Sequence, residues 1–181
     1  MQLTFSCTPQ TLENIEESLS KARLARYLGG AEGDKNHALK LYVWNARLCE
    51  TFYLPVQICE VACRNAIHTA LCGKHGERWF ERGGFLCTLP ERLRKELENT
   101  IRTERDAHGE QWSLDHLVSG LSFGFWQNLL TKDYENVFWP AYFNESFPHK
   151  PGHKDLETIY NQADLFRNHR NRIAHHKPIF D

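Results

Sequence analysis

The sequence places arginine, asparagine and histidine close together near its C-terminal end, in the stretch FRNHRNRIAHHKPIF at residues 166–180. A histidine can accept or donate a proton near neutral pH, and an arginine can bind a phosphate and stabilise charge that develops in a transition state. An asparagine can bind a phosphate oxygen or hold a histidine in place. RNA carries its own nucleophile, the 2′-hydroxyl, so these residue types suit cleavage of RNA without a metal ion or another cofactor.

Arg170 occupies a position where an apolar residue is expected. Asp155 is predicted to cap a helix that runs to about His175 and stops before Pro178. Burying an unpaired guanidinium is costly, so Arg170 is expected to have a partner or a ligand. Arg170 lies on the apolar line of this helix, whose other members are Leu156, Ile159, Ala163, Phe166 and Ile173.

A polar helix face is predicted next to Arg170. Asn171 and His175 are four residues apart, and Asn168 precedes Asn171 by three, so these three side chains should share one face. On an ideal helix Arg170 and His175 would point about 140° apart. Two ways of bringing them together remain open: the last helical turn loosens, or a second copy of the helix supplies the missing half.

An acidic residue interrupts the apolar face of an earlier helix, predicted over residues 56–71. Arg64 and Asn65 follow Glu60 by one turn. We hypothesise a contact between Glu60 and Arg170, which would be either an ion pair that fixes helix register or a carboxylate that orients the arginine toward a phosphate. Glu60 lies on a line whose other members are Val56, Cys63, Ile67 and Leu71.

Three segments resemble one protein family, in the same order along the chain. RNRIAH at residues 170–175 fits the R-x4-6-H motif that marks the HEPN superfamily of ribonucleases. The longer string RNRIAHHKPIF resembles the end of the abortive-infection-like (Abi-like) branch of that superfamily. EVACRN at residues 60–65 resembles an early helix of this branch, and LSFGFW at residues 121–126 resembles its middle segment, where Gly124 is predicted to allow close helix contact.

The resemblance implies a helical bundle that forms a homodimer by pairing its motif helices, so that two motifs meet in one cleft. It implies cleavage of RNA without a metal, with His175 as general acid or base, Arg170 as phosphate binder and Asn171 as supporting polar group. His176 is the alternative motif histidine, and Arg167 is a further supporting candidate. The expected setting is bacterial phage defence or a toxin–antitoxin pair, in which an antitoxin protein or RNA is the partner.

A second reading of the same motif remains open. Several HEPN proteins bind RNA or protein partners without cutting, so the alternative function is a non-catalytic module that binds RNA, a nucleotide or a protein partner. Loss of cleavage on replacing Arg170 or His175 would separate the two readings.

The composition of the 181-residue chain is that of an ordinary globular protein, with 25% charged and 41% hydrophobic residues. The formal net charge of −1 excludes a strongly basic nucleic-acid coat, so any contact with RNA must be local. No apolar run approaches the roughly 20 residues needed to cross a bilayer, and MQLTFSCTPQ lacks the pattern of a secretory signal. We therefore expect a cytoplasmic protein that does not enter a membrane, with its six cysteines reduced.

The remaining pattern predicts helices joined by short polar breaks, with almost no strand signal. Helices are expected over residues 11–27, 34–52, 56–71 and 88–108, with a break or kink at Pro55 and shorter helices capped by Ser113 and Ser122. The many aromatic residues are interpreted as core or dimer packing, and residues 149–154 as a basic loop. The fold class is all-α: one domain over residues 1–181, a bundle with peripheral helices on which residues 1–50 pack as a helical pair.

Overall fold

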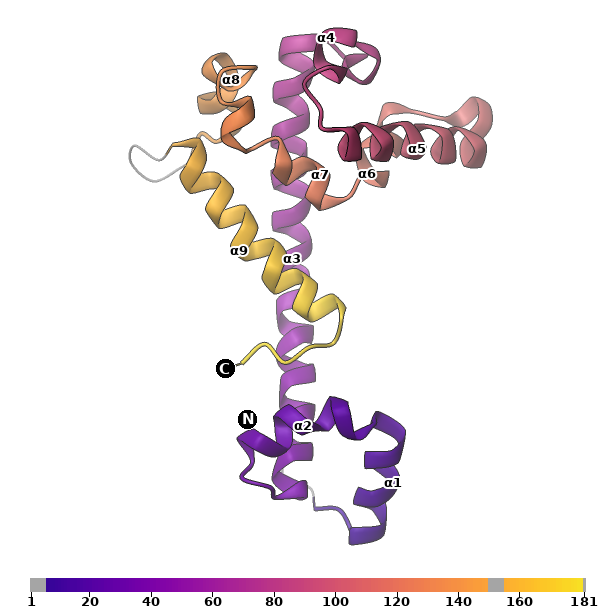
Figure 1. Ribbon diagram of the computed structural model, residues 1–181, viewed down its shortest axis with the longest axis vertical. Helices are drawn as coiled ribbons and strands as arrows, with labels where there is room; N and C mark the ends of the chain where they lie inside the picture. The colour runs from indigo at the N-terminus through magenta and orange to yellow at the C-terminus, as the bar shows by residue number, and fades with distance from the viewer. Residues whose placement is uncertain (1–5, 150–154, 181) are drawn as a thin grey trace. The chain divides into compact units, whose positions relative to one another are not determined.

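The computed structural model describes residues 6–149 and 155–180, and every regular element within these residues is a helix (Figure 1). The predicted all-α class is confirmed, whereas the bundle arrangement typical of HEPN proteins stays a prediction. Of the predicted basic loop, Lys150, His153 and Lys154 lie outside the described residues.

The chain divides into two compact units. The first unit comprises Met1–Gln57 and Asn168–Asp181, and the second comprises Ile58–Arg167. Two helices, α3 and α9, contribute residues to both units. A single domain over residues 1–181, with residues 1–50 packed on a bundle, stays a prediction.

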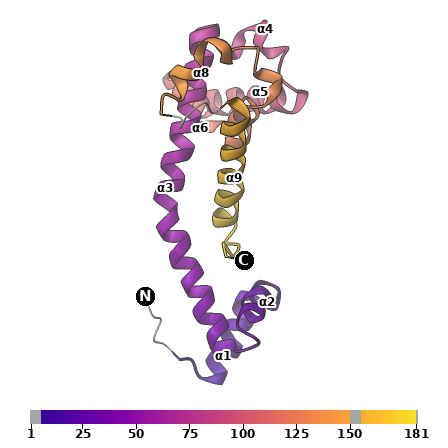
Figure 2. The same cartoon turned by 90° about the vertical axis from the view of Figure 1, so that its left-hand side faces the viewer.

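The first unit contains α1 (Pro9–Leu19), α2 (Lys21–Gly30) and the first part of α3 (Lys35–His75). Figures 1 and 2 both show α2 beside the first turns of α3. The prediction of one helix over residues 11–27 is wrong, because the chain turns at Ser20, whose φ is 71°. The hydroxyl of Ser20 accepts the backbone N–H of Arg23 and so caps α2. Serine favours such a cap over a place inside a helix because its side chain competes for backbone hydrogen bonds.

Of the break or kink expected at Pro55, the break is wrong, because α3 runs through this residue without interruption, and the kink stays a prediction. A proline inside a helix removes one hydrogen bond and crowds the carbonyl four residues earlier, here that of Thr51. Residues 51–55 are all exposed, so water can reach that carbonyl. The helix therefore continues across the position where the sequence pattern alone indicated two separate helices.

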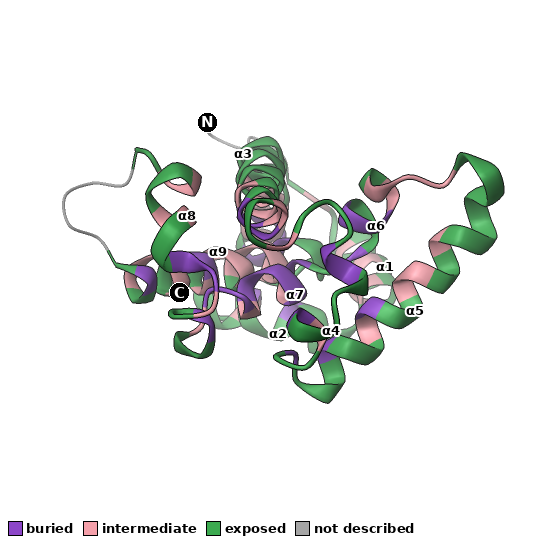
Figure 3. Ribbon diagram, turned by 90° about the horizontal axis from the view of Figure 1, so that it is seen from above, coloured by how far each residue is buried: buried purple, intermediate pink, exposed green. Residues whose placement is uncertain are grey.

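The second unit is built around an aromatic core. Trp79, Trp126 and Trp139 are almost completely buried, and the indole N–H of Trp139 donates to the carbonyl of Leu129 at 2.7 Å. Figure 3 shows α7 largely buried, whereas most of α5 is exposed. The interpretation of these aromatic residues as core is confirmed. The elements of this unit after α3 are η1 (Trp79–Glu81), α4 (Gly83–Leu86), α5 (Glu91–His108), η2 (Gly109–Gln111), α6 (Leu114–Gly120), α7 (Phe123–Asn128), η3 (Lys132–Tyr134), α8 (Trp139–Ser146) and the first part of α9 (Leu156–Ala174).

Gly73 lies inside α3, although the sequence pattern placed it just beyond the helix end. The hydroxyl of Tyr142 donates to the carbonyl of Gly73 at 2.6 Å, and a Cβ atom at Gly73 would lie 2.3 Å from Cε1 of the Tyr142 ring. Only glycine allows α8 to approach α3 this closely.

Replacing Gly73 with alanine is therefore expected to lower the free energy of unfolding by about 1–3 kcal/mol, since the Tyr142 ring must move and its hydrogen bond is strained. Urea unfolding followed by tryptophan fluorescence measures the change. The matched control is Gly83→Ala, because a Cβ atom at Gly83 meets nothing within 4 Å. Equal stability of the two variants would contradict the packing described for Tyr142.

Candidate functional site at the end of helix α9

Helix α9 begins and packs as its sequence predicts. The Asp155 carboxylate accepts the backbone N–H of Thr158 at 2.9 Å, which is the predicted cap. Along the predicted apolar line, Leu156, Ala163 and Ile173 are buried, and Arg170 is half-buried. The half-burial of Arg170 agrees with its predicted place on this line, and its role stays a prediction.

The last turn of α9 stays regular as far as His175. The backbone N–H of His175 still bonds the carbonyl of Asn171 at 3.0 Å. His176 then adopts a left-handed conformation with φ 53°, and its N–H bonds Ile173 at 3.0 Å, while Lys177 reaches back to Arg172 at 2.8 Å. These two bonds form a Schellman motif, with Pro178 following. The backbone bond of His175 thus keeps helical spacing one residue beyond the end of α9 at Ala174, which does not support a loosened turn before His175.

Arg170 and Asn171 interact directly. Nη1 of Arg170 donates to Oδ1 of Asn171 at 3.0 Å, and both residues are half-buried. His175 and His176 are exposed. The amide of Asn171 thus helps to fix the guanidinium, and the motif combines a half-buried arginine with two exposed histidines.

The predicted supporting residues of α3 belong to the second unit. Nε of Arg64 is 3.4 Å from Oδ1 of Asn65, so these two side chains are neighbours. Glu60 is half-buried, as expected for its place on the apolar line. Glu60 and Arg170 fall in different units, and their contact stays a prediction. Burial raises the pKa of the Cys63 thiol on the same line to about 11, so this cysteine stays protonated.

Arg167 is held by a short network within the second unit. Its Nη2 atom lies 2.9 Å from Oδ1 of Asp164, and the same oxygen accepts a hydrogen bond from the Gln127 amide at 2.8 Å. Gln127 is buried in α7, so this network and the edge contact of Phe123 with Phe166 join α7 to α9. Arg167 therefore belongs to a structural network that holds α7 against α9.

The middle segment LSFGFW forms the start of α7. The Ser122 hydroxyl accepts the N–H of Phe125 at 3.2 Å, which confirms the predicted cap. The predicted role of Gly124 is wrong: a Cβ atom there would meet only the Ser122 hydroxyl, at an ordinary 3.5 Å. The close approach between helices that the sequence assigned to Gly124 occurs instead at Gly73.

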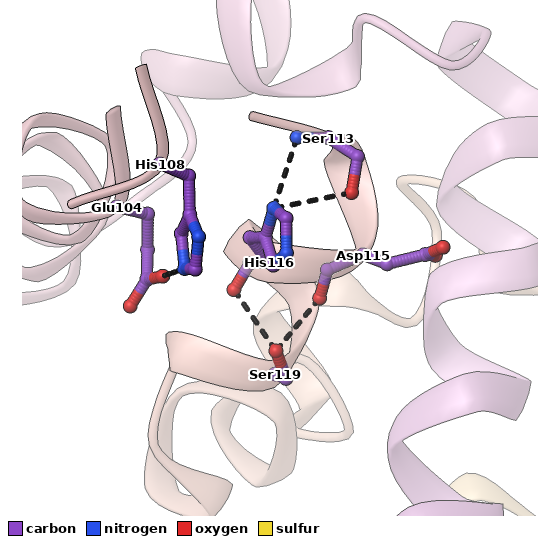
Figure 4. A network of polar contacts seen from close by, with 6 residues as sticks. All are labelled: Glu104, His108, Ser113, Asp115, His116 and Ser119. Atoms are coloured by element: carbon purple, nitrogen blue, oxygen red, sulfur yellow. Dashed lines mark hydrogen bonds and ion pairs between the residues drawn. The ribbon is translucent and has the colours of Figure 1, made fainter. Parts of the chain in front are cut away.

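The structure contains a pair of stacked histidines that the sequence did not predict. The rings of His108, at the end of α5, and His116, in α6, lie parallel with centroids 3.8 Å apart (Figure 4). Nδ1 of His116 accepts the N–H of Ser113 at 3.1 Å, and Nε2 of His108 is 3.4 Å from Glu104. Ser113 begins α6 as predicted, and His116 in the third helical position completes a capping box.

This histidine pair does not have the geometry of an acid–base site. A base and an acid that act on one phosphodiester must lie on either side of it. Rings stacked at 3.8 Å leave no room for a phosphate between them. We therefore assign His108 and His116 to the packing of α5 against α6.

In comparisons with known proteins, no family model, no curated protein and no solved structure matches the chain. In the part of the chain that the structure describes, no helix is both long enough and apolar enough to pass through a membrane. The described residues also contain no group of three or more His, Cys, Asp or Glu side chains that could hold a metal ion.

Proposed function

We propose that this protein is an Abi-like HEPN endoribonuclease that cleaves RNA without a metal ion and acts as a homodimer. The observation that carries the proposal is the end of α9, where a half-buried arginine held by Asn171 lies five residues, about 1.4 helical turns, before an exposed His175. The spacing from Arg170 to His175 fits the R-x4-6-H motif.

The chemistry follows from these residue types. The 2′-oxygen of one ribose attacks the adjacent phosphorus, and the bond from phosphorus to the 5′-oxygen breaks. His175 takes the proton of the 2′-hydroxyl or gives one to the departing 5′-oxygen. Arg170 binds the phosphate oxygens, on which negative charge accumulates in the transition state. The products are a 2′,3′-cyclic phosphate and a free 5′-hydroxyl.

The regular backbone as far as His175 supports a site shared between two chains. Five helical steps separate Arg170 from His175, so their side chains point about 140° apart. A second copy of α9 can place its His175 beside the Arg170 of the first chain, and a two-fold axis would then create two equal sites.

A non-catalytic module that binds RNA, a nucleotide or a protein is the second candidate. The same divergence of Arg170 and His175 favours it, because one chain alone does not assemble both groups around a phosphate. Phage defence or a toxin–antitoxin pair in the cytoplasm is the proposed setting, with RNA as substrate and an antitoxin as possible partner.

Incubating the purified protein with mixed cellular RNA in EDTA tests the proposal. We expect cleavage, with 2′,3′-cyclic phosphate ends detected by mass spectrometry, and no cleavage of DNA of matched sequence, because DNA lacks the 2′-hydroxyl. A requirement for Mg²⁺, or cleavage of DNA, would overturn the proposal of a metal-independent ribonuclease. Intact RNA at high protein concentration would favour the binding module.

A further inference from the structure

The first unit binds the segment that follows the motif helix, residues 176–180, which we term the tail. Arg23 of α2 donates to the carbonyl of His176 at 3.3 Å, and Arg26 donates to that of Phe180 at 3.4 Å. Arg172 of α9 donates to the carbonyl of Pro178 through Nε at 2.8 Å and also through Nη2. Three of the five tail carbonyls are therefore held by arginine side chains.

Asn45 completes these contacts from α3. It is only 4% exposed, and a buried amide is costly unless it is hydrogen-bonded. Its Oδ1 atom accepts the backbone N–H of Ile179 at 2.9 Å, whereas its Nδ2 atom makes a long contact of 3.7 Å with the sulfur of Cys49. Binding of the tail thus explains why a polar residue is buried at this position.

An aromatic anchor fixes the end of the tail. The ring of Phe180 lies 5.6 Å from that of Tyr27 and 6.0 Å from that of Trp44, between centroids. Tyr27 is 1% exposed and forms the centre of the small core of this unit, against which Phe180 packs. The tail is therefore bound as a peptide would be, by its main chain and by one aromatic side chain.

We propose that the tail is a strap that holds the motif histidines in place, with Asn45 and Phe180 as positioning residues; this inference rests on the proposed ribonuclease. His176 is the first tail residue and the left-handed residue of the Schellman motif. Its N–H donates to the carbonyl of Ile173, and its carbonyl accepts a hydrogen bond from Arg23. Exposed helix ends otherwise fray. A catalytic group must be held to within about 0.5 Å, so docking of the tail converts a fraying end into a defined site.

Hydrogen exchange and cleavage kinetics of the full-length chain test the strap. Phe180→Ala removes the aromatic anchor and keeps the buried residues Tyr27, Ala31 and Ala38, and it is expected to speed exchange of the Ile179 amide by about 100-fold. It should also shift the imidazole NMR signals of His175 and His176, and not that of His68 in the second unit. We expect the kcat of Phe180→Ala to fall by about 10–100-fold with KM nearly constant. Phe180→Tyr keeps an aromatic ring, so its exchange rate and its kcat should stay close to those of the wild type. Asn45→Leu should reproduce the loss.

The possible outcomes separate the strap from the ribonuclease. Unchanged exchange at Ile179 in Phe180→Ala would overturn the docking. Fast exchange with unchanged kcat and unchanged histidine signals would overturn the positioning role. If the wild type cleaves no RNA, the ribonuclease proposal fails, and the exchange rates and imidazole signals still decide whether the tail holds the histidines.

Discussion

If the proposed ribonuclease is right, replacing His175 with alanine is expected to lower the rate of RNA cleavage by about 10²–10⁴-fold, the contribution of a general acid or base. Replacing His176 with glycine is expected to lower the rate by less than about tenfold, because we propose His175 as the proton-transfer group. Single-turnover rates with one RNA substrate, measured in EDTA, give both values. Circular dichroism and gel filtration show whether folding and dimerisation are kept.

Glycine is the matched replacement for His176 because of the backbone. With φ 53°, His176 occupies the left-handed region, which costs a residue with a Cβ atom about 1–2 kcal/mol and costs glycine almost nothing. Alanine would remove the imidazole and keep the strain, so a defect would be ambiguous. His175 does not have a positive φ, so alanine is the neutral choice there.

The opposite pattern would reassign the motif. If His176→Gly abolishes cleavage and His175→Ala leaves it intact, His176 is the proton-transfer group, and the spacing from Arg170 has five intervening residues. If neither change reduces cleavage, the observed activity does not come from this site.

Local sequence signals predicted the parts of the fold that depend on neighbouring residues. The caps at Asp155 and Ser122 are formed by side chains that bond amides three residues ahead, so a short window of sequence contains both partners. The line through Arg170 on α9 follows from helical periodicity alone. The all-α class follows from the same periodicity, repeated along the chain.

The sequence-based predictions fail where the structure depends on contacts between residues that are far apart in the sequence. Asn45 and Ile179 are 134 positions apart, and no local pattern links a polar residue in α3 to the backbone of the tail. The sequence alone suggests that Gly73 ends a helix. The structure shows instead that Tyr142, 69 positions away, packs against it. At Pro55 the general rule for proline gave the wrong result, since exposure of the neighbouring turn limits the penalty.

The residue types of the candidate site come from the sequence, and its function stays a prediction. Asn171 was expected to share a face with His175, and the backbone bond between these residues agrees with that spacing, but the bond from Arg170 to the Asn171 side chain was not foreseen. The spacing of residues on a helix gives the direction of each Cα–Cβ bond, but it does not give the side-chain rotamers. A long arginine side chain can therefore reach the adjacent residue. The divergence of Arg170 and His175 stays a prediction from ideal helix geometry, and the backbone bond from His175 to Asn171 agrees with the helical spacing on which it rests.

A heterodimer of two inactive variants is expected to recover about half of the wild-type cleavage rate. One chain carries Arg170→Ala and the other His175→Ala, and two different affinity tags allow the mixed dimer to be isolated. If each site takes its arginine from one chain and its histidine from the other, one of the two sites in this dimer contains both wild-type groups. Its cleavage rate is compared with those of the two variant homodimers, which contain no complete site.

The reciprocal heterodimer makes the test decisive. Here a wild-type chain pairs with a chain carrying both Arg170→Ala and His175→Ala, so the number of substitutions is the same. A shared site predicts no activity, because each site then lacks either the arginine or the histidine. A site formed within one chain predicts the reverse: activity in this dimer and none in the first. A protein that stays monomeric while cleaving RNA would contradict the shared site outright, and the end of α9 would then have to rearrange to bring His175 to Arg170.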